Sequence, residues 1–235
     1  MLRSTKIVAT LGPASSSPEA LGALIAAGVD VVRLNFSHGT ADDHRARARL
    51  VRELAQQYRR PVGILVDLQG PKIRVGKFAD SKITLTKGEA FILDAACKLG
   101  NQERVGLDYP ELPNDVHAGD VLLLDDGRVV LHVTAVKGPE IHTKVQVGGP
   151  LSNNKGINRK GGGLSAPALT DKDKADMITA AEINADYLAI SFPREAADIH
   201  LSRELMKKAG GKSLIIAKIE RTEAIENLTE ILDAS

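Results

Sequence analysis

The chain has 235 residues, of which 43% are hydrophobic and 26% charged, and its net charge is +1; it has room for one large domain or two smaller ones. The balanced charge and the 3% aromatic content argue against a nucleic-acid partner, and a single cysteine, Cys97, excludes an internal disulfide. No apolar run reaches the ~20 residues that cross a bilayer and no signal peptide is recognisable, so we expect a cytoplasmic protein without a membrane partner.

The first third of the chain alternates between strand and helix patterns. Ser17, Pro18 and Glu19 are typical of a helix start, and Gly28 is a natural helix end. A second helix is expected to begin after Thr40. The predicted strands are residues 6–11, 31–37 and 62–68, and the predicted helices are residues 18–28 and 41–58.

From about residue 70 to residue 165, helical periodicity is nearly absent. Residues 83–86 and 90–93 flank Lys87-Gly88-Glu89, which predicts a hairpin. Residues 121–124 and 129–136 flank Asp125-Asp126-Gly127-Arg128, which predicts another. We therefore expect residues 70–165 to form a small antiparallel β-barrel or sandwich inserted in a loop.

Strand and helix patterns alternate again after residue 165. Thr170 and Asp173 resemble a capping box. Alternation implies parallel strands joined by right-handed crossovers. We expect residues 1–69 and 166–235 to form one discontinuous α/β domain, and a doubly wound open sheet is the alternative to a β/α barrel. The predicted strands here are 187–192 and 214–219. The predicted helices are 171–183, one that follows strand 187–192 and ends at about residue 209, and 223–232.

Polar side chains mark the carboxyl ends of the predicted strands. Arg33, Asn35 and Ser37 have spacing two and therefore share one face of a strand. Such a stripe is costly to bury unless it meets ligands or ions, and the alternative is an edge strand facing water. Asp67 ends the third strand. A carboxylate at this position is expected to be a metal ligand, a catalytic base or a cap of the next loop.

Lys218 and Glu220 follow the last predicted strand, again two residues apart. A structural ion pair would explain them, and so would a cation for a transferring phosphoryl group beside a carboxylate that holds a divalent ion. Without further information, these features indicate a barrel-like enzyme that acts on an anionic substrate.

Six segments together resemble the pyruvate kinase family, in the family's order. This resemblance covers the whole chain and implies a (β/α)8 TIM barrel with a lid-like β domain inserted after its third strand. It implies transfer of a phosphoryl group from phosphoenolpyruvate to ADP, which gives pyruvate and ATP, by a homotetramer in the cytoplasm. The segments are residues 6–15 (KIVATLGPAS), 33–39 (RLNFSHG), 67–74 (DLQGPKIR), 169–173 (LTDKD), 191–192 (SF) and 217–220 (AKIE).

The resemblance also implies roles for individual residues. Lys218 matches the catalytic lysine that contacts the phosphoryl group during its transfer, and Arg33 matches the arginine that contacts the same group. Glu220 matches a ligand of Mg²⁺ or Mn²⁺. The remaining matches are Asn35, Ser37 and Asp67 at the monovalent-cation site, and Thr10, His38 and Lys155 near the nucleotide. Arg74, also a match to a substrate- or nucleotide-binding residue, forms with Asp126 a barrel–lid pair that meets when the lid closes.

Two features of the chain depart from the family pattern. Lys72 stands where many potassium-requiring members have an acidic residue, so its ammonium is expected to replace K⁺. The chain ends before the second metal carboxylate, three barrel strands and the regulatory domain, so we expect about five of eight strands and no activity of these residues alone. The alternatives are a fragment that only binds ligands, or a barrel lyase that uses Lys218 on a keto acid.

Overall fold

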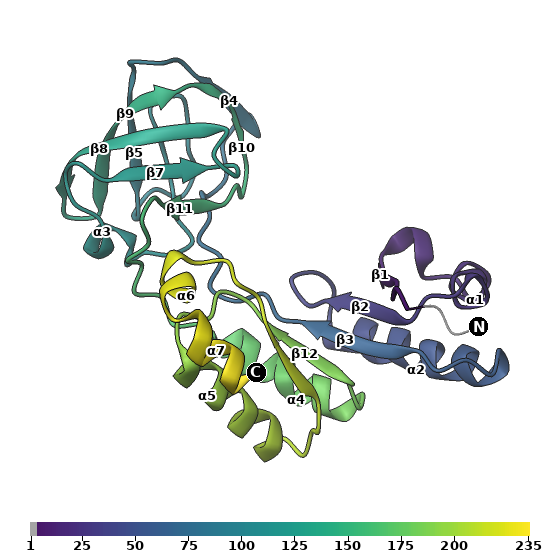
Figure 1. The fold of residues 1–235 in the computed structure, drawn as a ribbon. Coiled ribbons are helices and arrows are strands. Elements are labelled where there is room, and N and C mark those ends of the chain that lie inside the picture. The colour runs from purple at the N-terminus through teal and green to yellow at the C-terminus, as the bar shows by residue number, and fades with distance from the viewer. Residues whose placement is uncertain (1–3) are drawn as a thin grey trace. The chain divides into compact units, whose positions relative to one another are not determined.

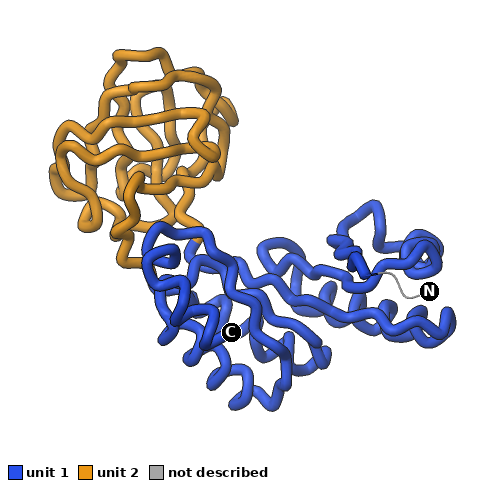
Figure 2. Tube along the Cα trace, viewed as in Figure 1, with its two compact units in different colours: residues 1–71, 167–235 blue, residues 72–166 orange. Residues whose placement is uncertain are grey.

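A computed structural model describes residues 4–235 (Figure 1). The chain divides into two compact units, which Figure 2 shows in different colours. Unit 1 ends its first segment at Pro71 and resumes at Pro167, and unit 2 is Lys72–Ala166. Among residues 4–235, none of the helices has the length and apolar character needed to span a membrane.

Unit 1 contains five strands that all pair in parallel, in the order β1-β2-β3-β12-β13. Within this unit each strand neighbours the next one in sequence. A doubly wound sheet reverses its strand order, whereas a β/α barrel does not. The sequential order therefore argues against the doubly wound alternative. The strands are β1 (Val8–Thr10), β2 (Val31–Asn35), β3 (Gly63–Asp67), β12 (Tyr187–Ile190) and β13 (Leu214–Ala217).

Three helices of unit 1 begin where their capping residues predict: α1 (Pro18–Ala27), α2 (Ala41–Gln57) and α4 (Asp171–Glu182). The other helices of the unit are α5 (Ala196–Lys208), α6 (Thr222–Glu226) and α7 (Leu228–Ala234), with a 3-10 turn, η1 (Pro13–Ser15). The Ser17 hydroxyl accepts from the Ala20 N–H, and Gly28 ends α1 with a φ of 107°. Thr170 and Asp173 form the expected capping box.

The prediction of one helix over residues 223–232 is wrong. Asn227 separates α6 from α7. Its side-chain amide donates to the Arg194 carbonyl at 2.9 Å. An asparagine that bonds to backbone elsewhere competes with helix continuation, and this contact marks the break.

The core of unit 1 lies on one face of strand β2. Val32, Leu34 and Phe36 are buried and belong to the same apolar cluster as residues of the helices. Arg33 and Asn35 lie on the opposite face, as the spacing predicts. The edge-strand alternative is wrong, because β2 pairs with β1 on one side and β3 on the other.

Unit 2 is built mostly of antiparallel strands. A six-stranded sheet has the order β11-β7-β8-β9-β5-β6, and β10 pairs with β4 in a second sheet. The one helical turn in this unit is α3 (Leu112–Asp115). The strands are β4 (Lys82–Leu85), β5 (Ala90–Asp94), β6 (Arg104–Val105), β7 (Val121–Leu124), β8 (Val129–Lys137), β9 (Glu140–Val147), β10 (Gly149–Ser152) and β11 (Ile157–Arg159).

One of the two predicted hairpins in unit 2 is confirmed. Strands β7 and β8 pair directly, with Leu124 opposite Val129. The predicted hairpin of β4 with β5 is wrong, because β4 pairs with β10 and β5 with β9 and β6. The intervening turn docks on β9 instead: the Gly88 N–H donates to the Val145 carbonyl, and the Val145 N–H donates to the Glu89 carbonyl. This turn carries the chain from one sheet to the other.

The two ends of unit 2 are joined to each other by backbone hydrogen bonds. The Val75 N–H donates to the Lys155 carbonyl at 2.9 Å, and the Ile157 N–H donates to the Ile73 carbonyl at 2.8 Å. A bridge between Arg74 and Gly156 lies between these bonds. The entering and leaving segments therefore form an antiparallel neck.

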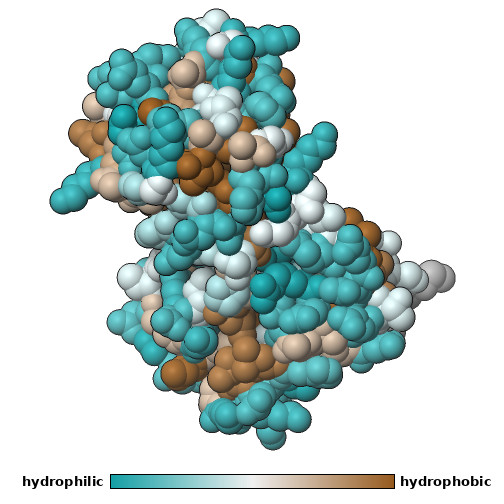
Figure 3. Space-filling view, turned by 90° about the vertical axis from the view of Figure 1, so that its left-hand side faces the viewer, coloured by the Kyte–Doolittle hydropathy of each residue, from teal (hydrophilic) through white to brown (hydrophobic). Residues whose placement is uncertain are grey.

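Apolar side chains also reach the surface of both units, where Figure 3 shows them among mostly hydrophilic neighbours. In unit 1 they include Val8 on β1, which is 57% exposed, and Leu214 on β13, which is 61% exposed. These two strands are the edges of the five-stranded sheet. An exposed edge with apolar side chains is typical of a surface that another element covers.

Candidate active site

The carboxyl ends of the strands in unit 1 bring a group of charged side chains together around Asp67. This residue ends β3, and its side chain is 5% exposed. One carboxylate oxygen accepts from Arg33 through Nε at 2.7 Å and the terminal nitrogen Nη2 at 2.6 Å. The guanidinium also donates to the Thr10 hydroxyl at 3.0 Å. Residues from three adjacent strands therefore meet at one point.

The Lys218 ammonium completes this cluster from the far side. Its Nζ atom lies 3.1 Å from the other carboxylate oxygen of Asp67 and 2.9 Å from the Ser191 hydroxyl oxygen. A lysine removed from water is costly unless a carboxylate and further hydrogen bonds meet it, and both are present here. Asp67 is thus a shared counter-ion for two cations, Arg33 and Lys218.

Glu220 lies beside Lys218, as the two-residue spacing predicts. One of its carboxylate oxygens is 3.5 Å from the Lys218 Nζ atom, and the other accepts from the Phe192 N–H at 3.2 Å. Oxygen donors of this kind suit Mg²⁺, which takes one or two protein carboxylates and keeps other positions for water and substrate phosphates. Within the described part of the chain, no three His, Cys, Asp or Glu side chains form a metal-binding group.

Asn35 and Ser37 lie at the end of β2. Asn35 is the direct register partner of Asp67, and its side-chain oxygen accepts from the Ser37 N–H at 3.1 Å. The three residues expected at a monovalent-cation site are thus placed at neighbouring strand ends. The Phe36 carbonyl between them accepts from the Lys172 ammonium at 2.7 Å.

The loop after β2 is fixed by a buried histidine. The His44 ring stacks on Phe36 with 3.9 Å between ring centroids, and its Nε2 lies 3.0 Å from the His38 carbonyl. Burial lowers the pKa of His44, because the imidazolium would lose its hydration. A neutral ring with its proton on Nε2 donates to His38 and keeps the loop in place.

Four of the expected site residues lie in unit 2. Lys155 pairs with Asp125 at 2.8 Å, and Arg74 donates to the Asn154 carbonyl at 2.9 Å. Asp126 occupies the β7–β8 turn with a φ of 56°, and Lys72 is the first residue of the unit. Arg74 and Asp126 both belong to unit 2, and their role as a pair that meets when a lid closes stays a prediction.

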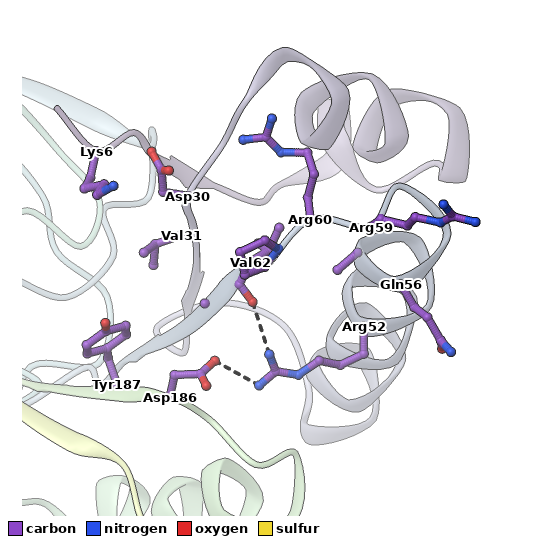
Figure 4. A pocket seen from close by; sticks show the side chains of 13 residues that line it. Lys6, Asp30, Val31, Arg52, Gln56, Arg59, Arg60, Val62, Asp186 and Tyr187 are labelled. Carbon is purple, nitrogen blue, oxygen red and sulfur yellow. Dashed lines mark hydrogen bonds and ion pairs between the residues drawn. The ribbon is translucent and has the colours of Figure 1, made fainter. Parts of the chain in front are cut away.

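A cavity of about 770 Å³ opens at the opposite, amino end of the strands (Figure 4). Val31, Gly63 and Tyr187 are the first residues of their strands and line it. Arg52 crosses it and donates to the Val62 carbonyl and to Asp186. None of the expected site residues lines this cavity. The cluster around Asp67 is therefore the candidate active site.

Comparison with known proteins assigns the chain to a family. Residues 2–235 match the family described as "Pyruvate kinase, barrel domain". The chain belongs to the pyruvate kinase family. A pyruvate kinase of Haemophilus influenzae is 58% identical over 228 residues, which are 96% of this chain and 48% of that protein.

Other relatives agree with the assignment to pyruvate kinase. Pyruvate kinase II of Salmonella typhimurium is 57% identical over 226 residues, which cover 95% of this chain and 47% of that protein. Pyruvate kinase of Mycobacterium intracellulare is 45% identical over 232 residues, with 99% and 49% covered. The chain spans about half the length of the curated relatives it matches.

Sequence reasoning gave no role to two residues within the pyruvate kinase motifs. Ser191 is buried at the end of β12 and contacts Lys218, and Lys172 binds the backbone between Asn35 and Ser37. Their contacts join segments far apart in the sequence. A polar residue directly after the apolar run of β12 was the available signal for Ser191.

Proposed function

We propose that the chain contributes the cluster of Arg33, Asp67 and Lys218 to a phosphotransferase that acts on phosphoenolpyruvate and ADP. In this reaction the phosphorus–oxygen bond to enolpyruvate breaks while a bond to the terminal phosphate oxygen of ADP forms. The enolate that leaves takes up a proton at its methylene carbon and becomes pyruvate, and the other product is ATP. Support comes from the names of the relatives and from the two cations held at the strand ends.

The observation that carries this proposal is the position of Lys218. Its ammonium is held by Asp67 and Ser191, which belong to the protein itself. A preorganised cation stabilises negative charge that develops on a transferring phosphoryl group. Arg33 holds the same group from the opposite side of Asp67. We propose that Thr10, His38 and Lys155 contribute to binding of the nucleotide.

The metal sites follow from the carboxylates and amide oxygens in the cluster. Mg²⁺ or Mn²⁺ neutralises the phosphate charges when it is bound, and Glu220 supplies one protein ligand. We propose that Asn35, Ser37 and Asp67 are the side chains that line a monovalent-cation site. We propose that Lys72 replaces that ion and that unit 2 serves as a lid on a β/α barrel within a homotetramer.

The Lys218→Met variant, made in the full-length natural protein, tests this function. We expect turnover to fall at least ~10²-fold, by analogy with the loss of one preorganised donor. The Michaelis constant for phosphoenolpyruvate should change little, because the charge of Lys218 acts mainly in the transition state. Pyruvate formation is followed in a coupled assay. Turnover of the variant within tenfold of the parent would contradict the assignment of Lys218.

A further inference from the structure

Two consecutive residues that follow β12 contact the two charged side chains that follow β13. Ser191 contacts Lys218, and Phe192 contacts Glu220. We infer that Ser191 and Phe192 are positioning residues, which fix Lys218 and Glu220 in one arrangement through a side-chain hydroxyl and a backbone N–H. This inference rests on the proposed phosphoryl transfer. Neither residue carries a charge, and neither donates a proton to a reacting group.

Ser191 determines where the Lys218 ammonium lies. The serine side chain is buried, with 2% of the residue exposed. Its hydroxyl donates to the Leu68 carbonyl at 2.6 Å and accepts from the Lys218 Nζ atom at 2.9 Å. Because its single proton is used by Leu68, a lone pair of the oxygen faces the ammonium. Asp67 holds the same ammonium from another side, so its position is fixed by two partners.

Phe192 determines where the Glu220 carboxylate lies. Its φ of 57° is in the left-handed region, which is unfavourable for a residue other than glycine. In this conformation the Phe192 N–H donates to Glu220 at 3.2 Å. The Arg221 guanidinium carbon lies 6.0 Å from the centre of the Phe192 ring. Strained backbone of this kind is concentrated at functional sites, because the surrounding structure must hold it there.

The two residues are held in place by the turn after β3. A Cβ atom added to Gly70 would lie 2.7 Å from the Ser191 Cβ and 3.0 Å from a ring carbon of Phe192. The absence of a side chain at Gly70 therefore allows close packing of this turn against both residues. Close support by a second layer of residues is what keeps a catalytic group within the narrow range of productive geometry.

The first experiment compares Ser191→Ala with Ser202→Ala in the natural polypeptide. Ser202 is also buried in unit 1, and its hydroxyl donates to the Asp198 carbonyl at 2.7 Å, away from the cluster. We expect Ser191→Ala to lower kcat about 10–100-fold with less than about a threefold change in KM, which is the sign of a loss specific to the transition state. Ser202→Ala should stay within about twofold of the parent kcat. Ser191→Cys, which keeps a weaker hydrogen-bonding group, should recover part of the rate.

The second experiment uses Mn²⁺ binding, followed by electron paramagnetic resonance, and does not depend on turnover. Phe192→Asn and Phe192→Val both remove the ring, but asparagine tolerates a positive φ and valine does not. We expect the valine variant to bind Mn²⁺ about tenfold more weakly than the asparagine variant, which corresponds to about 1.4 kcal/mol of binding free energy.

The outcomes separate the two proposals. Equal Mn²⁺ affinity of the valine and asparagine variants, or equal kcat of the two alanine variants, would overturn the positioning roles. A parent protein that binds Mn²⁺ but does not transfer the phosphoryl group would contradict the proposed function instead, while the Mn²⁺ comparison would still decide the role of Phe192.

Discussion

Gly70 offers a direct test of how tightly the turn after β3 packs against β12. Its φ is +65°, and a Cβ atom there would meet the Ser191 Cβ at 2.7 Å and the Ser191 carbonyl oxygen at 3.0 Å. In Gly70→Ala, the left-handed backbone costs roughly 1–2 kcal/mol. The crowding adds ~1–3 kcal/mol, as for other overpacked sites. We expect unit 1 to lose about 2–5 kcal/mol of unfolding free energy.

Gly210→Ala is the matched control in the same unit. Gly210 has a φ of +82°, and nothing lies within 4 Å of the added Cβ. This variant should therefore show the backbone cost without the crowding, so it should be less destabilised than Gly70→Ala by about 1–3 kcal/mol.

The assay is urea unfolding followed by circular dichroism at a helical wavelength. Unit 2 contains a single helix of 4 residues, so the helical signal reports almost entirely on unit 1. If Gly70→Ala and Gly210→Ala were equally destabilised, the close packing of Gly70 against Ser191 would be refuted.

Two further predictions concern ions and protons. In a buffer with tetramethylammonium as the only cation besides Mg²⁺, we expect added KCl to increase the rate of phosphoryl transfer only slightly. The Lys72→Glu variant should instead need K⁺ for full activity. Strong activation of the parent by K⁺ would exclude Lys72 as a substitute for the ion. Burial lowers the pKa of His44 below its value of 6.5 in the unfolded chain, so the unfolded state binds more protons and the stability of unit 1 should fall as the pH drops from about 7 through the folded-state pKa. His44→Gln should flatten this slope in urea unfolding between pH 5 and 8, and an unchanged slope would show that another group titrates.

The sequence predicts the local structure of unit 1 well because its signals are local. Ser17 and Thr170 cap their helices by contacts within three residues. The spacing of Arg33 and Asn35 gives their common face for the same reason. The position of Lys218 and Glu220 after an apolar strand likewise indicated a polar group at a strand end. Thr10 entered the site only through the resemblance to a family.

The errors arise where distant segments decide the structure. Strand β4 was assigned to its neighbour β5, but its partner β10 follows more than sixty residues later. Asn227 breaks a helix through a bond to Arg194, which the pattern of residues 223–232 does not reveal. The contact of Ser191 with Lys218 spans 27 positions and needs two adjacent strands. Such pairings depend on the topology of the sheet, which periodicity does not contain.

The neck of unit 2 has a consequence for how such a chain can evolve. Because the Ile73–Ile157 and Val75–Lys155 hydrogen bonds bring the two ends together, all the residues between them leave and return at nearly the same place. The apolar cluster of unit 2 draws only on its own residues. A gene could therefore gain, lose or exchange this segment in a single recombination event without opening the core of unit 1. The flanking strand β3 and helix α4 would need only a short linker in its place.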